Sequence, residues 1–307
     1  MLSRKNKVVF LKLISLFSLV RGYNIVIIVL AQYLTAVFIL APELPLSAIF
    51  LDDSLFSLIL ASAISIAGGY IINDFYDKEK DLINRPNKYM LDHLISQRTQ
   101  LTVYFILNFL AVIIASYVSF KAVLFFSIYI FAIWLYSHKL KKYAIIGNIA
   151  AALLAITPFF AVFIYYKNFD KVIFVHAVFL FLILLIREMM KDLSNIKGDL
   201  VQNYQTVPVI YGEKVSKIGI SMLVALSLIP IYLLLQKFDL GYMVYYFYAS
   251  IGLLLFFLVG VWKSESTINY VRLHNILKLI IVVGALSIVL IDPYVIINRI
   301  PKLPSLL

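Results

Sequence analysis

Long apolar runs separated by short polar segments dominate the chain, and these runs determine the predicted architecture. A helix needs roughly 20 apolar residues to cross a hydrocarbon core about 30 Å thick. Because lipid offers no partners to backbone polar groups, and the alternation typical of a membrane β-barrel is absent, we expect helices. The pattern predicts an all-α, polytopic membrane protein whose nine transmembrane helices cover residues 15–41, 54–72, 101–119, 122–137, 143–166, 172–190, 216–236, 241–262 and 276–297.

The composition requires the same lipid environment. Of the 307 residues, 63% are hydrophobic and only 14% are charged, whereas soluble domains are about half apolar and a quarter charged. The chain has no Cys, which excludes disulfides, Cys-ligated zinc and a thiol nucleophile. The basic start before the first run resembles a signal peptide, but the run is too long, so we expect a first anchor. We interpret residues 1–307 as a single transmembrane domain.

Basic residues are distributed unevenly over the predicted loops. With nine spans, the N-terminal segment and alternate loops fall on one side, and that side holds 21 of the 27 Lys and Arg residues. By the positive-inside rule, this predicts a cytoplasmic N-terminus. Since the basic residues lie between apolar runs rather than in one cluster, they indicate orientation and anion binding, not a nucleic-acid surface. We predict an integral protein of a bacterial or archaeal cell membrane.

Polar residues repeat at helical spacing after the second run. Asn73, Asp77 and Asp81 recur every four residues, so at about 100° per residue their side chains share one face of a helix. Asp74 and Glu79 point elsewhere. A second set follows the sixth run and also predicts one narrow face: Glu188, Asp192, Asn195 and Asp199.

Both sets begin at the end of an apolar helix and belong to loops that we predict to be cytoplasmic. Ionisable groups at membrane depth are costly, so they commonly face a polar cavity and carry function. Oxygen ligands without Cys suit a hard cation, Mg²⁺ before Zn²⁺, and Mg²⁺ in proteins keeps water and phosphate oxygens as ligands. Either set alone is equally consistent with a solvated acidic loop, but two matching sets on one side favour a site that holds a diphosphate through two metal ions.

These residues resemble the UbiA superfamily of intramembrane prenyltransferases. The family signature N-D-x-x-D-x-x-x-D, usually followed by I-N-x-P, is met by residues 73–81 and 83–86. The second family signature is D-x-x-D-x-x-x-D, and here Asn195 replaces its middle Asp, which removes one negative charge. Weaker similarities lie at Tyr136-Ser137, Gly147-Asn148 and residues 206–212.

The resemblance implies a ring of nine helices around a central cavity and an Mg²⁺-dependent transfer of a prenyl group from a polyprenyl diphosphate to a lipophilic acceptor. It implies that Asn73 and Asp77 hold one Mg²⁺ and that Asp192 and Asp199 hold the other, with support from Asp81, Glu188 and Asn195. We predict the catalytic residues to be Asn73, Asp77, Asp81, Asp192 and Asp199.

Direct contacts to the diphosphate are expected from basic and polar side chains on the same side. The candidates are Arg85, Lys139, Lys141, Arg187, Tyr136, Ser137, Arg21 and Asn24. Each basic residue among them is equally consistent with ordinary loop charge. Arg21 and Asn24 lie within the first apolar run, where either the cavity wall or bonding between helices would satisfy them.

The acceptor is less constrained. The setting of the second signature, R-E-x-x-K-D-x-x-x-x-x-G-D, is most similar to the branch that prenylates geranylgeranylglyceryl phosphate in ether-lipid synthesis. An aromatic quinone precursor remains an alternative acceptor, and a membrane transporter is the alternative from another class. The D-G-x-x-A-R pattern of alcohol phosphotransferases is missing. No obligate protein partner is indicated.

Overall fold

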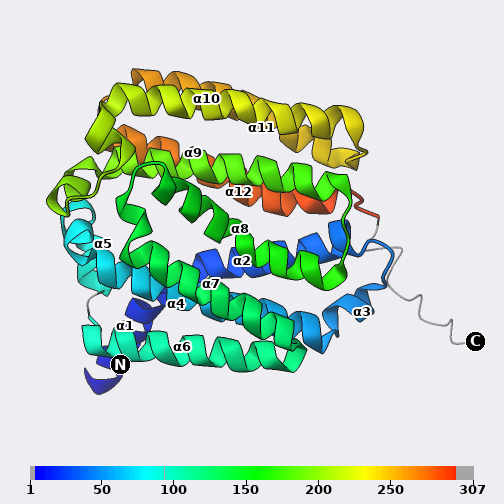
Figure 1. The fold of residues 1–307 in the computed structure, drawn as a ribbon, viewed down its shortest axis with the longest axis horizontal. Coiled ribbons are helices and arrows are strands. Elements are labelled where there is room, and N and C mark those ends of the chain that lie inside the picture. The colour runs from blue at the N-terminus through cyan, green and yellow to red at the C-terminus, as the bar shows by residue number, and fades with distance from the viewer. Residues whose placement is uncertain (1–3, 93, 295–307) are drawn as a thin grey trace, which may run out of the picture.

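The computed structural model describes residues 4–92 and 94–294, and this part of the chain is almost entirely helical (Figure 1). Nine of its helices are long and apolar enough to cross a membrane, which confirms the predicted number of spans. In chain order the longer elements are α1 (Arg4–Leu19), α2 (Gly22–Thr35) with the π-helical turn η1 (Ala36–Leu40), α4 (Asp53–Asn84), α6 (Gln97–Val118), α7 (Phe120–His138), α8 (Ile146–Tyr166), α9 (Lys171–Val201), α10 (Val207–Lys237), α11 (Val244–Lys263) and α12 (Thr267–Ser287). The short elements are α3 (Leu46–Phe50), α5 (Pro86–Asp92), η2 (Leu140–Lys142), η3 (Gly241–Met243) and η4 (Ile288–Leu290).

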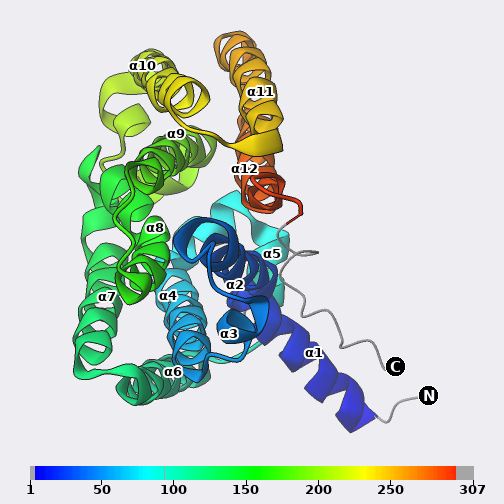
Figure 2. The same ribbon diagram turned by 90° about the vertical axis from the view of Figure 1, so that its right-hand side faces the viewer.

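The first apolar run was predicted to form one helix over residues 15–41, but the structure breaks it at Arg21. Arg21 adopts a left-handed conformation, with φ 50° and ψ 52°, and this ends the preceding helix. Gly22 allows the sharp turn, because a Cβ at this position would lie 2.1 Å from the Phe17 ring. As a result, α1 points away from the other helices (Figure 2) and packs against α5. The spanning segment therefore begins only at Gly22.

The helices that carry the acidic residues are longer than predicted. The runs 54–72 and 172–190 continue as helix to Asn84 and Val201, so both acidic sets lie within α4 and α9 rather than in loops. The polar residues repeat every three or four positions, which keeps one face polar while the other faces stay packed. Both helices end at the same end of the bundle, on the side of α5 (left in Figure 1).

The last span also has different bounds. α12 begins at Thr267, earlier than the predicted 276, because polar residues in its first turns line a cavity instead of forming a loop. Regular helix ends at Ser287 and is followed only by η4. Of the predicted span 276–297, residues 295–297 lie outside the described part. α10 contains a break at Gly212, whose φ of 81° suits glycine.

Pro158 inside α8 shows how the bundle satisfies its backbone. Proline has no N–H, so the carbonyl of Leu154, one turn earlier, loses its helical donor. The Tyr129 hydroxyl of α7 donates to that carbonyl at 3.1 Å. Gln32 of α2 donates from Nε2 to the Pro158 carbonyl at 2.9 Å. These bonds join α2, α7 and α8 at a depth where lipid supplies no partner.

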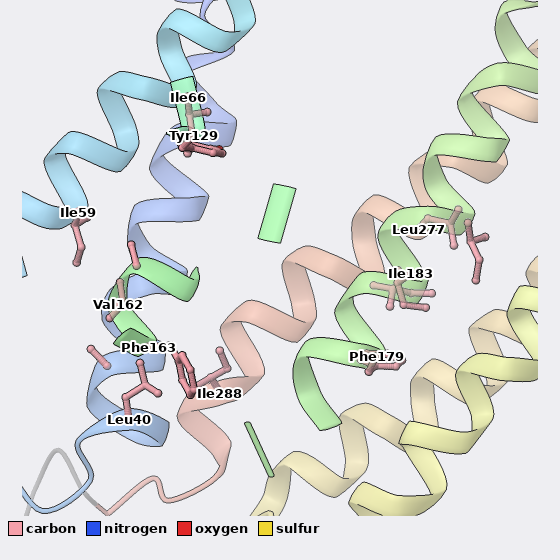
Figure 3. Close-up of a cluster of buried hydrophobic side chains, with 14 of the residues drawn as sticks. Leu40, Ile59, Ile66, Tyr129, Val162, Phe163, Phe179, Ile183, Leu277 and Ile288 are labelled. Atoms are coloured by element: carbon pink, nitrogen blue, oxygen red, sulfur yellow. The ribbon is translucent and has the colours of Figure 1, made fainter. Parts of the chain in front are cut away.

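The packed helices surround a central cavity. α6 packs outside α4, and α10 packs outside α9. Buried apolar side chains from η1, α4, α7, α8, α9, α12 and η4 face inward (Figure 3). Leu40, Phe163 and Ile288 lie together in this view, and all three line the central cavity at the end far from α5.

Candidate functional site

A cavity of about 870 Å³ occupies the centre of the bundle. Its wall comes mainly from α2, α4, α7, α8, α9 and α12, while α6 and α10 contribute no lining residue from the described chain. Phe174 and Asp192 both line it, although they lie about 27 Å apart along α9 at 1.5 Å per residue. The cavity therefore runs from a polar end beside α5 to an apolar end across the bundle.

Most of the predicted site residues meet at the polar end. The cavity is lined by Arg21, Asn24, Asn73, Asp77, Asp81, Arg85, Tyr136, Ser137, Lys141, Arg187, Glu188, Asp192 and Asn195. Asp199 and Lys139 do not line it. Asp74 and Glu79 are absent from the wall as well, as their positions off the acidic face predicted. We call Asn73, Asp77 and Asp81 the α4 half-site, and Glu188, Asp192 and Asn195 the α9 half-site.

The α4 half-site is centred on the buried Asp77 carboxylate. Lys141 of η2 forms an ion pair with its Oδ1 at 2.8 Å. Asn73, one turn earlier, donates from Nδ2 to Oδ2 at 3.0 Å, and the Tyr204 hydroxyl donates to Oδ1 at 3.1 Å. Burial, and next the charge of Asp77, raise the pKa of the Tyr204 phenol, so this phenol stays a donor.

The α9 half-site has a different partner set. Asn148, in the first turn of α8, donates from Nδ2 to Oδ2 of the buried Asp192 at 2.7 Å. Gly147 lets α8 begin close against η2, since a Cβ there would lie 3.0 Å from the Leu140 carbonyl oxygen. Glu188 is ion-paired with Lys191 one turn later on α9. No ion pair to Asp192 occurs in the described chain.

Asp199 lies beyond the end of the cavity. It is fully buried, pairs with Lys80 of α4 at 2.5 Å and accepts from the Thr206 hydroxyl at 3.2 Å. Asp199 shares a helical face with Asp192, but it lies about 10 Å further along α9. There the segment leading into α10 covers it. The structure gives Asp199 a lysine partner and no place on the cavity wall.

The ends of α4 and α9 are joined beside the two half-sites. The Asn84 side chain accepts from the Gly198 N–H at 3.3 Å and donates to the Asn195 carbonyl at 3.4 Å. Gly198 is required for this contact, because a Cβ there would lie 2.3 Å from Asn84 Nδ2. Asn84 belongs to the I-N-x-P segment, and Pro86 begins α5 directly after it. This α4–α9 seam holds both carboxylate faces at one end of the bundle.

The cations at the polar end form two groups. The lysine group (Lys80, Lys141 and Lys191) interacts directly or electrostatically with Asp77 and lines the cavity. The arginine-rich cluster (Arg21, Arg85, Arg187 and Lys278) also lines the cavity, and Lys278 of α12 feels the like charges of the other three members.

Two members of the arginine-rich cluster have local partners. Arg21 lies over the Tyr70 ring at 4.9 Å, and Asn24 donates to the Tyr70 hydroxyl at 3.2 Å. This answers the question left open for Asn24, because it lines the cavity and also bonds between helices. The Nε–H of Arg187 donates to His274 Nε2 of α12 at 3.3 Å.

The sequence analysis missed several residues of this end. Lys80 and Lys191 follow Asp77 and Glu188 by three residues. This spacing places each pair on one helical face, so both lysines could have been predicted from the sequence. Tyr204, His274 and Lys278 carried no such signal, because they come from segments far along the chain. Asn148 appeared only as a weak family similarity.

The donor set fits Mg²⁺ better than a softer metal. No three His, Cys, Asp or Glu groups within residues 4–92 and 94–294 lie close enough to hold an ion by themselves. Instead, Asp77 and Asp192 line one cavity together with the amides Asn73 and Asn195. Mg²⁺ is commonly bound by one or two carboxylates, with water and substrate phosphates completing its octahedron. Oxygen donors that form an incomplete shell are consistent with such a site.

Comparison with known proteins gives a family match over most of the chain. The model of the UbiA prenyltransferase family matches residues 23–291. The digeranylgeranylglyceryl phosphate synthase of Thermococcus sibiricus is 32% identical over 227 residues, which cover 72% of this chain and 79% of that protein.

Solved structures share the fold. A digeranylgeranylglyceryl phosphate synthase structure has a TM-score of 0.68 at 22% identity, covering 91% of this chain and 98% of the other. A UbiA homologue from Archaeoglobus fulgidus, bound to GPP and Mg²⁺, has a TM-score of 0.65 at 16% identity, covering 90% and 99%.

Proposed function

Because the chain belongs to the UbiA prenyltransferase family, we propose that it transfers a geranylgeranyl group from its diphosphate to geranylgeranylglyceryl phosphate, with Mg²⁺ as cofactor. The observation that carries this proposal is the shared cavity. Asp77 of α4 and Asp192 of α9 line its polar end, while its apolar end extends across the bundle and can hold a prenyl chain.

The two half-sites supply the metal ligands in this proposal. Asn73 and Asp77 hold one ion, Asp192 holds the second, and Asp81, Glu188 and Asn195 support them. The predicted ligand Asp199 acts instead by holding Lys80 in place, given their buried ion pair. Bound Mg²⁺ supplies an electrophile that stabilises the charge developing on the departing diphosphate.

The chain's own cations complete the diphosphate site. Lys141 and Lys80 line the cavity next to Asp77, and Lys191 lies one turn from Glu188. Ammonium groups beside phosphate oxygens form short, charge-assisted hydrogen bonds. Tyr136 and Ser137 line the same wall and offer hydroxyl groups. Lys139 does not line the cavity, so in this proposal it contributes only to the positive charge of its loop.

The reaction balances without a redox partner. The allylic C–O bond to the diphosphate breaks, and its electron pair leaves with the diphosphate. The acceptor hydroxyl oxygen forms the new ether bond to the same carbon, and its proton passes to water or to the released diphosphate. The enzyme must therefore hold the two reactants together and exclude water from the allylic cation.

The choice of acceptor rests on the relatives. The relative that shares 32% identity over 72% of the chain is named a digeranylgeranylglyceryl phosphate synthase. This name supports the ether-lipid acceptor over the aromatic quinone precursor. The family match supports a prenyltransferase over a transporter. The archaeal relatives support an archaeal membrane, and the distribution of basic residues supports a cytoplasmic polar end.

A test is product analysis with purified protein in detergent. Geranylgeranyl diphosphate is offered with geranylgeranylglyceryl phosphate or with a prenylatable aromatic acid, each with Mg²⁺ or with EDTA. We expect mass spectrometry to find the doubly prenylated glyceryl phosphate only when Mg²⁺ is present. Prenylation of the aromatic acid alone, or product formation in EDTA, would contradict the proposal.

A further inference from the structure

This inference rests on the proposed function and extends it. We propose that the arginine-rich cluster binds the phosphate monoester of the acceptor, and that this anion site is separate from the diphosphate site. Arg187 and Lys278 are its central members, with Arg21 and Arg85 beside them. His274 is a positioning residue for Arg187.

Four helical segments bring these charges to one place. Arg21 precedes α2, Arg85 follows α4, Arg187 belongs to α9 and Lys278 to α12, and all four line the polar end of the cavity. Arg187 and Lys278 lie in membrane-spanning helices, where unpaired charge is costly and commonly marks a binding site.

The cluster is not neutralised by acidic partners. Among the described residues, none of its four cations forms an ion pair. The charges of Asp81 and Glu188 act on Arg21, and Glu188 also interacts with Arg187. Glu188 is already paired with Lys191. Four like charges in a partly enclosed space repel one another, so a multivalent anion would bind there with large electrostatic gain.

One hydrogen bond prepares Arg187 for such an anion. Its Nε–H donates to His274 Nε2, so this ring nitrogen accepts and is unprotonated. The bond fixes one edge of the guanidinium plane and leaves the terminal amino groups free for phosphate oxygens. Arginine recognises phosphate through such planar, forked contacts.

The cluster is distinct from the cations that serve the carboxylates. Asp77 interacts with Lys141, Lys80 and Lys191, and Asp192 interacts with Lys191 and Lys80. Members of the arginine-rich cluster are absent from both sets. Lys278, in contrast, interacts with Arg187, Arg21 and Arg85. Glu188 lies beside Arg187 and feels its charge, but its ion pair is with Lys191. The polar end thus offers two anion sites: one at Asp77 and Asp192 for a metal-bound diphosphate, and one at four cations that form no ion pair in the described chain.

A phosphate monoester acceptor requires this division. Both reactants carry phosphate, so a single anion site would let them compete. The acceptor's phosphate is attached to the same glycerol unit as the hydroxyl that reacts. Anchoring it beside the metal-bound diphosphate keeps that hydroxyl near the allylic carbon, whereas an uncharged acceptor would gain nothing from the four cations.

The test compares Lys278→Gln with Arg272→Gln. Both substitutions remove a cation from α12, but Arg272 is exposed and does not line the cavity. For Lys278→Gln we expect the KM for geranylgeranylglyceryl phosphate to rise about 10- to 100-fold, as for a lost charge-assisted bond, while the KM for geranylgeranyl diphosphate stays within about twofold. Arg272→Gln should change neither. An equal rise in both KM values, or no rise in either, would overturn the inference.

Binding without turnover separates this inference from the proposed function. Labelled geranylgeranylglyceryl phosphate and its dephosphorylated alcohol are titrated into the wild type, Lys278→Gln and His274→Gln in the absence of donor. The wild type should prefer the phosphorylated lipid, and both variants should lose most of that preference. If the wild type makes no product yet shows the preference, only the proposed function fails. If the variants keep the preference, the phosphate site is wrong whatever the activity.

Discussion

The two half-sites face one cavity with similar residues, but their carboxylates are held differently. Asp77 of the α4 half-site contacts an ammonium, an amide and a phenol. Asp192 of the α9 half-site has one amide partner, Asn148. The charge of Asp77 is thus compensated in place, whereas Asp192 relies on more distant cations. In the proposed function, a divalent ion at Asp77 would compete with Lys141, whereas Asp192 would offer it a carboxylate without an ion-paired lysine in the described chain.

This difference predicts different roles for α4 and α9. The partners of Asp77 hold the α4 half-site in place, and under the proposed function Lys141 would donate to the diphosphate once a metal ion took its place at Asp77. The α9 half-site lacks one family carboxylate, because Asn195 stands where an Asp is usual. If this half-site holds a divalent ion, as we propose, its affinity should depend mainly on Asp192. The following substitutions test this difference between the two half-sites.

The largest effect is expected from removing either central carboxylate. Asp77→Asn and Asp192→Asn should each lower turnover by about 10³-fold, since each loses several kcal/mol of metal-mediated stabilisation of the leaving group. Steady-state rates at saturating Mg²⁺ measure this. Glu79→Gln, an exposed carboxylate on α4 outside the cavity, is the control and should retain full activity. Near-normal turnover in either Asn variant would remove the metal-site proposal.

Asp199→Asn should act on stability instead of on metal binding. Breaking this buried ion pair removes the direct partner of Lys80, whose other acidic neighbour, Asp77, is already paired with Lys141. Such a loss commonly costs about 3–5 kcal/mol. A lower melting temperature in detergent is the expected readout, with an unchanged Mg²⁺ requirement in the protein that remains folded. The double variant Lys80→Met/Asp199→Leu removes both charges and should recover much of the stability. A stable Asp199→Asn protein with a raised Mg²⁺ requirement would instead restore Asp199 as a ligand.

Asn148→Ala and Tyr204→Phe compare the partners of the two carboxylates. Asn148 is the sole hydrogen-bond donor to Asp192 in the described chain. Its loss should raise the half-saturating Mg²⁺ concentration by about 10- to 100-fold, as for other residues that orient metal ligands. Tyr204→Phe leaves Asp77 with Lys141 and Asn73, and its effect should be smaller. Half-saturating Mg²⁺ concentrations for the two variants test the order, and equal effects would contradict the difference between half-sites.

The smallest effect is expected from Asn195→Asp. Adding a carboxylate to the α9 half-site should lower the half-saturating Mg²⁺ concentration by roughly three- to tenfold, because charge count tunes affinity for hard cations. Asn195→Gln keeps the neutral amide and serves as the control. If Asn195→Asp leaves the half-saturating Mg²⁺ concentration unchanged, residue 195 lies outside the coordination sphere of the ion.

Local periodicity predicted much of this molecule. Nine apolar runs were sufficient to predict the nine spans, and the spacing of Asn73, Asp77 and Asp81 predicted a shared face correctly. Spacing describes rotation about a helix axis, however, and not depth along it. Asp199 therefore looked equivalent to Asp192, although it lies two turns further on, where Lys80 and Thr206 enclose it.

Tertiary neighbours could not be predicted in this way. Tyr204 approaches Asp77, and His274 approaches Arg187, only because α9 packs against both α4 and α12. The break at Arg21 had a local cue in Gly22, but the apolar residues on both sides concealed it. The sequence thus predicted which helices carry the chemistry, and the structure supplies the partners of each group.

The α4–α9 seam bears on what the enzyme makes rather than how fast it works. An allylic cation is trapped by any nucleophile within reach, and the most abundant one is water. The Asn84 side chain contacts Gly198 and lies between the two helix ends beside the half-sites. If a bulkier residue at 198 pushed Asn84 aside, solvent would enter at the moment of bond cleavage, and part of the prenyl diphosphate would leave as free alcohol instead of ether lipid.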